Sequence, residues 1–254
     1  MASLLPRFER HELTYKTLDN TPFHVSTLIP KSIISSTKTC PILVHFHGGA
    51  LIQGVTLEPA FLSSWMLELA EKVDAIVIDP AYRLLPEARG TDVLDDIKDF
   101  WAWSALLFPE SKIRVVMAQY PSMYPDLKAY NQRLESATAE EDQLITDYTE
   151  NNKGKIRLGS KFPWKPELIL AFGHSLRIAK QVPPIWIAQG VDDHITPKPG
   201  TDEMIEMIKE LQPAAPFLYS VQPGDHGFDN DHGLEEPWVA EAMKFVTTIR
   251  IEDI

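Results

Sequence analysis

The chain alternates short apolar runs with longer segments in which apolar residues recur every three to four positions. The short runs indicate strands buried on both faces, and the longer period indicates helices packed on one side. Near the N-terminus, residues 11–18 and 22–29 alternate loosely and are rich in Thr, Val and Ile. Turn-forming residues at 19–22 separate them, which predicts an antiparallel hairpin at one edge of a sheet. Buried strands are then predicted at 41–47, 75–79, 113–118, 185–189 and 217–222, and helices at 59–73, 91–106, 201–211 and 235–250.

This order of elements predicts an α/β fold. Strands that alternate with helices form a mostly parallel sheet covered by helices on both faces. A chain of 254 residues has the length of one such domain, so a single domain over residues 1–254 is expected. Between about residues 121 and 181 the pattern loosens into a polar, charge-rich stretch, which is too long for a plain loop in a compact domain. We interpret this stretch as a cap or lid insertion.

The composition narrows the classes of function. The net charge of −12 and the pI near 5.1 disfavour nonspecific binding to nucleic acid, which needs clustered Lys and Arg. No apolar run approaches the roughly 20 residues that span a bilayer, and the N-terminus lacks the apolar core of a signal peptide. Cys40 is the only cysteine, so no intrachain disulfide can form. We therefore expect a cytoplasmic protein with no membrane span and no nucleic-acid partner.

The first candidate for chemistry is a loop that leaves the first buried strand and reads His-Phe-His-Gly-Gly-Ala at 45–50. Glycines let the backbone turn sharply and approach a bound group. Adjacent peptide N–H groups can then point at one oxygen, as an oxyanion hole requires. We expect Gly48, Gly49 and Ala50 to form such a hole, and an ordinary strand-to-helix turn is the alternative. An alanine at the third position is tolerated if its φ is negative.

A second motif follows the next buried strand and reads D-x-x-YRL-x-PE at 79–87. Together with the preceding loop, it resembles the hormone-sensitive-lipase group of carboxylesterases (α/β-hydrolase fold-3) in the α/β-hydrolase superfamily. The resemblance extends from about residue 20 to residue 250. In that family the stretch shapes the floor of the site. The resemblance therefore implies that Tyr82, Arg83 and Glu87 hold the loop through hydrogen bonds and do not react.

The resemblance also implies an acid and a base near the C-terminus. In α/β-hydrolases these residues leave two consecutive late strands, in the chain order Ser, Asp, His. Matching G-x-x-D-x-x-x-P at 190–197 assigns the acid to Asp193, with Asp192 as the runner-up, and the base to His226. The base would deprotonate the nucleophile, and the acid would orient the base. The alternative is that Asp193 caps a helix and His226 is a surface-loop residue.

The nucleophile of such a site cannot be identified, because no G-x-S-x-G occurs in the sequence. The predicted helix ends near Leu107, and residues 108–112 lead directly into the next buried strand. We therefore predict the loss of one unit: the central strand, the nucleophile elbow and the helix behind it. Ser175, in Gly-His-Ser-Leu-Arg, is a candidate substitute, although arginine stands where glycine is required. Ser122 is less suitable because tyrosines flank it.

The resemblance implies hydrolysis of small-molecule esters by acyl transfer to serine, with no metal or organic cofactor. The alternative is a catalytically inactive protein that keeps the pocket and binds a small ligand or partner. A homodimer whose partner completes the reduced sheet is a further alternative. Two histidines, His45 and His47, could suggest a metal site, but their place in a buried strand before glycines favours a structural role.

Overall fold

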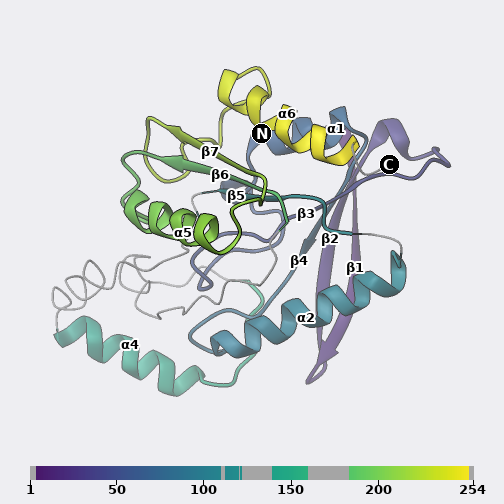
Figure 1. Cartoon of the computed structure of the whole chain (residues 1–254). Coiled ribbons are helices and arrows are strands. Elements are labelled where there is room, and N and C mark those ends of the chain that lie inside the picture. Colours follow the sequence, from purple (N-terminus) through teal and green to yellow (C-terminus); the bar gives the residue numbers. More distant parts are fainter. Residues whose placement is uncertain (1–3, 110–111, 120, 122–138, 160–182, 252–254) are drawn as a thin grey trace. The chain divides into compact units, whose positions relative to one another are not determined.

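The computed structural model describes residues 4–109, 112–119, 121, 139–159 and 183–251 (Figure 1). The chain divides into two compact units. Unit 1 comprises Met1–Ser111 and Ala137–Ile169, and unit 2 comprises Lys112–Ser136 and Leu170–Ile254. The elements of unit 1 are η1 (Leu5–Arg7), β1 (Phe8–Leu18), β2 (Thr21–Pro30), η2 (Lys31–Ile33), β3 (Ile42–Val44), η3 (Pro59–Phe61), α1 (Ser64–Lys72), β4 (Ile76–Pro80), α2 (Gly90–Leu107) and α4 (Ala139–Asn152). Those of unit 2 are β5 (Val116–Gln119), β6 (Ile185–Gly190), α5 (Lys198–Leu211), β7 (Phe217–Gln222) and α6 (Pro237–Ile251).

Unit 1 is built on a four-stranded mixed sheet in the order β1-β2-β4-β3. The pairs β1–β2 and β2–β4 are antiparallel, and β3–β4 is parallel. Asp19 and Asn20 connect β1 to β2 with φ of 47° and 62°. Two consecutive positive φ angles are typical of a type I′ turn, whose twist matches that of the flanking strands. The predicted hairpin at a sheet edge is therefore confirmed.

One face of this sheet is covered by α2 (Figure 1). Phe100 on α2 is fully buried in a cluster with Tyr15, Phe23, Val25 and Ile78 from three strands. The rings of Phe100 and Tyr15 lie 6.0 Å apart at 87°, an edge-to-face arrangement that aromatic pairs favour. The buried stripe of α2 thus anchors the helix on the N-terminal hairpin and on the strand that carries the second sequence motif.

Unit 2 is built on a three-stranded parallel sheet in the order β5-β6-β7. The central strand β6 is buried along its whole length. Ile185 and Ile187 pack against α5, whereas the ring of Trp186 lies 6.2 Å from that of Trp238 on α6. Since successive residues of a strand point to opposite faces, α5 and α6 cover opposite faces of this sheet (Figure 1). Here the predicted parallel sheet with helices on both faces is confirmed.

Several predicted boundaries differ from the observed ones. The single helix predicted at 59–73 is divided into η3 and α1, because Leu62 and Ser63 between them adopt extended backbone conformations. The first strand predicted to be buried covers Ile42–Val44 rather than 41–47, and its residues are half-buried rather than buried. Only three of the five strand pairs among the described residues are parallel, since the N-terminal hairpin joins the sheet antiparallel.

Part of the predicted cap lies outside the described residues. Of residues 121–181, the structure describes Pro121 and residues 139–159. The latter belong to unit 1 and contain α4. The described helices include none that is long and apolar enough to cross a membrane.

Candidate functional site

The glycine loop in unit 1 begins where β3 ends and turns back within a few residues. The N–H groups of Ile52 and Gln53 both donate to the carbonyl oxygen of Gly49, at 3.0 and 3.1 Å. Gly49 has a φ of +101°, and a side chain there would overlap the carbonyl of Gln53. Glycine is therefore required at this position by both the backbone conformation and the space available.

The next residue departs from the sequence prediction. A negative φ was the condition for tolerating Ala50 in this loop, but its φ is +53°, and that of Leu51 is +63°. Both lie in the left-handed region, which costs a non-glycine residue about 1–2 kcal/mol. Within the part of the chain that the structure describes, the N–H groups of Gly48, Gly49 and Ala50 have no acceptor. The strained loop therefore leaves three peptide donors available, which is a requirement of an oxyanion hole.

Tyr82 contacts the glycine loop through both its hydroxyl group and its ring. The Tyr82 hydroxyl donates to the carbonyl oxygen of His47 at 2.6 Å, and the two rings stack with centroids 4.4 Å apart. Burial raises the pKa of Tyr82, and the charge of Asp79 adds to the effect, so the hydroxyl remains a donor. Burial also lowers the pKa of His47, although its hydrogen bond to the Gly48 carbonyl opposes the shift. Tyr82 thus holds the loop by hydrogen bonding, as predicted.

Arg83 and Glu87 are held in the same manner within unit 1. The Arg83 guanidinium donates to both carboxylate oxygens of the buried Asp96, at 2.8 and 2.9 Å. Glu87 accepts from the Tyr148 hydroxyl at 2.7 Å and lies 2.7 Å from the guanidinium of Arg157. The hydrogen bonds predicted for Arg83 and Glu87 are therefore confirmed, and Glu87 connects the motif to α4 and the segment after it.

In unit 2, the predicted acid and base are in contact. Asp193 follows β6 and His226 follows β7, and the carboxyl ends of these parallel neighbours lie at one edge of the sheet. His226 Nδ1 lies 3.0 Å from Asp193 Oδ2 and 3.2 Å from Oδ1. A carboxylate only accepts, so Nδ1 carries a proton, and Nε2 is the basic nitrogen of the neutral ring. The runner-up, Asp192, is exposed, and its N–H donates to Gly224.

The Asp193 carboxylate is fixed by further donors. Its Oδ1 accepts from the N–H of Thr196 at 2.7 Å and of Ile195 at 2.9 Å, and Gln189 Nε2 donates to Oδ2 at 3.2 Å. Burial alone would raise the pKa of Asp193, but the hydrogen bonds from His226 and Thr196 outweigh it and hold the pKa below its usual range. Asp193 therefore accepts the backbone hydrogen bonds expected of a helix cap and contacts His226 at the same time.

Sequence reasoning did not identify Asp225, which joins the two loops that carry this pair. Its Oδ1 accepts from the N–H of His226 at 2.7 Å and from the N–H of His194 at 3.1 Å. These bonds, together with one from the His194 ring, lower the pKa of Asp225 to about 2. Its position directly before His226 was the available signal.

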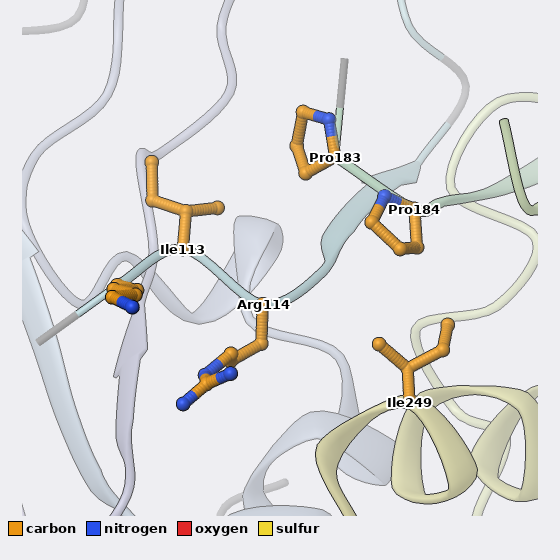
Figure 2. A pocket seen from close by; sticks show the side chains of 6 residues that line it. Ile113, Arg114, Pro183, Pro184 and Ile249 are labelled. Atoms are coloured by element: carbon orange, nitrogen blue, oxygen red, sulfur yellow. The ribbon is translucent and has the colours of Figure 1, made fainter. Parts of the chain in front are cut away.

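A cleft of about 320 Å³ in unit 2 lies away from this pair (Figure 2). It is lined by residues that precede β5 and β6 and by α6: Lys112, Ile113, Arg114, Pro183, Pro184 and Ile249. These residues lie at the amino ends of parallel strands, whereas Asp193 and His226 follow the carboxyl ends. Since ligands of open α/β sheets bind at the carboxyl ends, the cleft is not part of the candidate site.

The remaining candidates have different outcomes. Ser175 and Ser122 lie outside the described residues. Among the residues that are described, no group of three or more His, Cys, Asp or Glu is placed to hold a metal ion. His45 and His47 instead contact Asp79 and Gly48, respectively.

Comparison with known proteins shows what the chain is similar to. A model of the alpha/beta hydrolase fold matches residues 43–107. The "Probable carboxylesterase" of Phoma sp. is 27% identical over 307 aligned positions, covering 95% of this chain and 96% of the relative. A "Probable carboxylesterase" of Cochliobolus lunatus is 27% identical over 187 positions, covering 48% of this chain and 86% of the relative. A hyperthermophilic esterase from Pyrobaculum calidifontis shares the fold with a TM-score of 0.51 at 16% identity, over 97% of this chain and 86% of that structure. Residues 43–107 are therefore similar to the alpha/beta hydrolase fold family, and the two named relatives are probable carboxylesterases.

Proposed function

We propose that this protein hydrolyses carboxylic esters of small molecules by acyl transfer to serine. Asp193 and His226 are the acid and base, Gly48, Gly49 and Ala50 bind the oxyanion, and Ser175 is the nucleophile. The observation that carries the proposal is the 3.0 Å contact between His226 Nδ1 and Asp193 Oδ2 at the carboxyl ends of neighbouring strands. The names of the relatives as carboxylesterases support the substrate class.

The chemistry follows from the proton positions. The serine oxygen attacks the ester carbonyl carbon while its proton passes to Nε2 of His226, and the carbonyl π electrons move to oxygen. Peptide N–H groups stabilise that oxyanion. When it collapses, the bond to the alkoxy group breaks, and the leaving alcohol takes the proton from Nε2. Water then attacks the acyl-serine with the same base, which releases the carboxylic acid and restores the serine.

Asp193 has two effects in this scheme. Its lowered pKa keeps it ionised at neutral pH, so it fixes the Nδ1–H tautomer of His226. It also stabilises the imidazolium that forms when Nε2 takes a proton. The backbone donors from Thr196 and Ile195 hold the carboxylate in place for both effects.

A second function is binding of a small ester or acyl compound without turnover. It is favoured by the sequence itself, which contains no G-x-S-x-G and has arginine two positions after Ser175. A protein of this kind would use the peptide N–H groups of Gly48 to Ala50, together with Asp193 and His226, as polar groups that recognise a ligand.

We also infer that an internal strand, elbow and helix are missing between α2 and β5. The Phoma alignment has 307 positions but contains only about 241 residues of this chain, which is 95% of 254, so about 66 positions of the relative have no counterpart. The Cochliobolus alignment has 187 positions and about 122 residues of this chain (48% of 254), which leaves about 65. A whole βαβ unit needs about 30 residues, so the number of unmatched positions in each alignment is large enough for a strand, turn and helix.

The sheets support the same inference. In the described residues, β3 pairs only with β4, and β5 pairs only with β6, so each unit has an open parallel edge. Only residues 108–115 separate α2 from β5. Sequencing the transcript across Leu106–Ile113 tests the inference. Transcripts with an additional in-frame segment support it, and a gene with no coding sequence between these residues contradicts it.

The proposed hydrolase activity is tested by intact-mass measurement after incubation with a fluorophosphonate, followed by peptide mapping. We expect one adduct on Ser175, loss of the adduct in Ser175→Ala, and retention in Ser122→Ala. The same preparations are assayed with p-nitrophenyl butyrate.

A folded sample that gives neither an adduct nor release of nitrophenol contradicts the hydrolase proposal. Tryptophan fluorescence titration with p-nitrophenyl butyrate then tests the second function. Saturable binding supports it, and the absence of binding at millimolar ester contradicts it.

A further inference from the structure

A single carboxylate oxygen joins the two ends of the glycine loop in unit 1. Asp79, in β4, is fully buried. Its Oδ2 accepts from the N–H of Leu57 at 2.6 Å and lies 3.1 Å from Nδ1 of His45. His45 is the first residue after β3, at the start of the loop, and Leu57 lies at its end. Every residue of the loop at 46–56, including the donors Gly48 to Ala50, therefore lies between two contacts to one atom.

The hydrogen-bond partners of His45 determine its protonation state. Its Nε2 lies 3.0 Å from the carbonyl oxygen of Phe61, which can only accept, so Nε2 carries a proton. Its Nδ1 faces the carboxyl group of Asp79. That oxygen already accepts from a peptide N–H, which favours the ionised carboxylate. A hydrogen bond from Nδ1 to an ionised carboxylate also needs a proton on Nδ1, so the contacts of the two ring nitrogens fit an imidazolium paired with Asp79.

The surroundings support this charge assignment. The side chain of His45 is 8% exposed and that of Asp79 is 0% exposed, so water does not screen the pair. Oδ1 of Asp79 is buried and has no hydrogen-bond partner among the described residues. An uncompensated anion in such a place is strongly unfavourable, so His45 is the group that balances the charge. The neighbouring His47 remains neutral, because burial lowers its pKa.

We propose that Asp79 and His45 are positioning residues that hold the glycine loop in its oxyanion-binding conformation through this buried ion pair. The proposal rests on the proposed function of Gly48 to Ala50 as oxyanion donors. Ala50 and Leu51 are in strained left-handed conformations, and such strain persists only where the surroundings fix the backbone. A fixed beginning and end supply that constraint. Neither residue contacts the reacting atoms in this scheme.

The first test needs no variant. In protein labelled with ¹⁵N in histidine, at about neutral pH, the His45 ring is expected to show protons on both nitrogens, whereas the His47 ring shows one. In Asp79→Asn the charge is removed, and His45 is expected to retain a single proton. A His45 ring with one protonated nitrogen in the unmodified protein would overturn the proposal, whether or not the protein is active.

The second test separates positioning from general loss of structure. Asp79→Asn is expected to lower kcat for p-nitrophenyl butyrate by about 10²-fold, the effect of losing an oxyanion donor, with KM unchanged. Asp74→Asn is the matched control, because Asp74 is an exposed carboxylate just before the same strand and contacts only Ser32 by its side chain among the described residues. An Asp79→Asn variant with unchanged kcat, or with a raised KM alone, contradicts the proposal.

Hydrogen exchange keeps this proposal distinct from the proposed function. If the unmodified protein gives neither turnover nor a fluorophosphonate adduct, the hydrolase function fails. The positioning of the loop by Asp79 and His45 is then tested by amide exchange at Leu57 and in residues 46–56. We expect faster amide exchange in Asp79→Asn than in Asp74→Asn, and equal exchange rates in the two variants would overturn the proposed positioning role.

Discussion

Replacing Asp96 with Asn removes the negative charge from a fully buried carboxylate on α2. Asp96 accepts from the Arg83 side chain at 2.8 and 2.9 Å, from the Arg83 N–H at 2.9 Å, and from the ammonium group of Lys16. These partners come from the motif that follows β4 and from β1. The carboxylate therefore ties α2 to two other parts of unit 1, and its hydrogen bond is the main reason that the pKa of Arg83 is raised.

The magnitude follows from the burial of the three groups. Removing one partner of a buried ion pair costs about 3–5 kcal/mol, because a charge remains without compensation. Here the side chains of Lys16 and Arg83 are 15% and 16% exposed, and asparagine still offers one acceptor. We therefore expect the lower end of the range, about 3 kcal/mol. That corresponds to a fall in Tm of about 6–12 °C for a unit of this size.

The assay is urea unfolding followed by tryptophan fluorescence, since α2 carries Trp101 and Trp103 beside Phe100. Asp99→Asn is the matched control. Asp99 lies on the same helix, 2.8 Å from the same Lys16 ammonium, but its side chain is 56% exposed. We expect its replacement to cost less than about 1 kcal/mol. Equal losses in the two variants, or a loss below about 1 kcal/mol in Asp96→Asn, would refute the argument from burial.

Three further predictions concern the candidate site. Asp193→Asn is expected to slow fluorophosphonate labelling by about 10⁴-fold through loss of the correct His tautomer, whereas Asp192→Asn keeps the wild-type rate; similar rates in both variants would assign no role to the acid. Gly49→Ala is expected to lower the free energy of unfolding by more than about 1 kcal/mol, because φ is positive there and the added carbon overlaps the backbone of Gln53. Gly90→Ala is the control, and it is expected to be neutral or stabilising because no atom lies within 4 Å of the added carbon. The pKa of Asp225 is about 2 in the folded protein and about 3.9 in the unfolded chain. Its stabilising effect is therefore fully present above the unfolded pKa and is lost as the pH falls through the folded pKa. A carboxyl NMR titration of Asp225 with a midpoint near the unfolded pKa would contradict this.

The pattern of apolar residues predicted the strands and helices because burial repeats locally along the chain. The breaks within them were harder to predict. Periodicity extended one helix across 59–73, although the backbone is extended at Leu62 and Ser63. Asp96 was not identified as buried, because a carboxylate on a helix normally faces solvent. Its cationic partners, Lys16 and Arg83, are 80 and 13 residues away in sequence, so a local pattern contains no sign of them.

The proximity of Asp193 and His226 could be predicted because both residues follow consecutive strands of the fold. The groups that support them could not be predicted in the same way. Gln189 lies near the end of an otherwise apolar strand, and only the structure shows that its buried amide donates to Asp193. The sign of φ at Ala50 could not be predicted either, because the residues of this loop are compatible with both a positive and a negative φ at that position.

The contact between Asp193 and His226 is formed by elements that do not include a nucleophile segment. Asp193 and His226 follow β6 and β7, which pair directly with each other. The donors that fix Asp193 come from β6 itself and from the loop after it. Asp225 then joins that loop to the one that carries His226. Loss of a strand, elbow and helix between α2 and β5 would therefore leave the pair intact. Its presence is expected in both the hydrolase and the ligand-binding function, so covalent labelling of a serine is the observation that separates them.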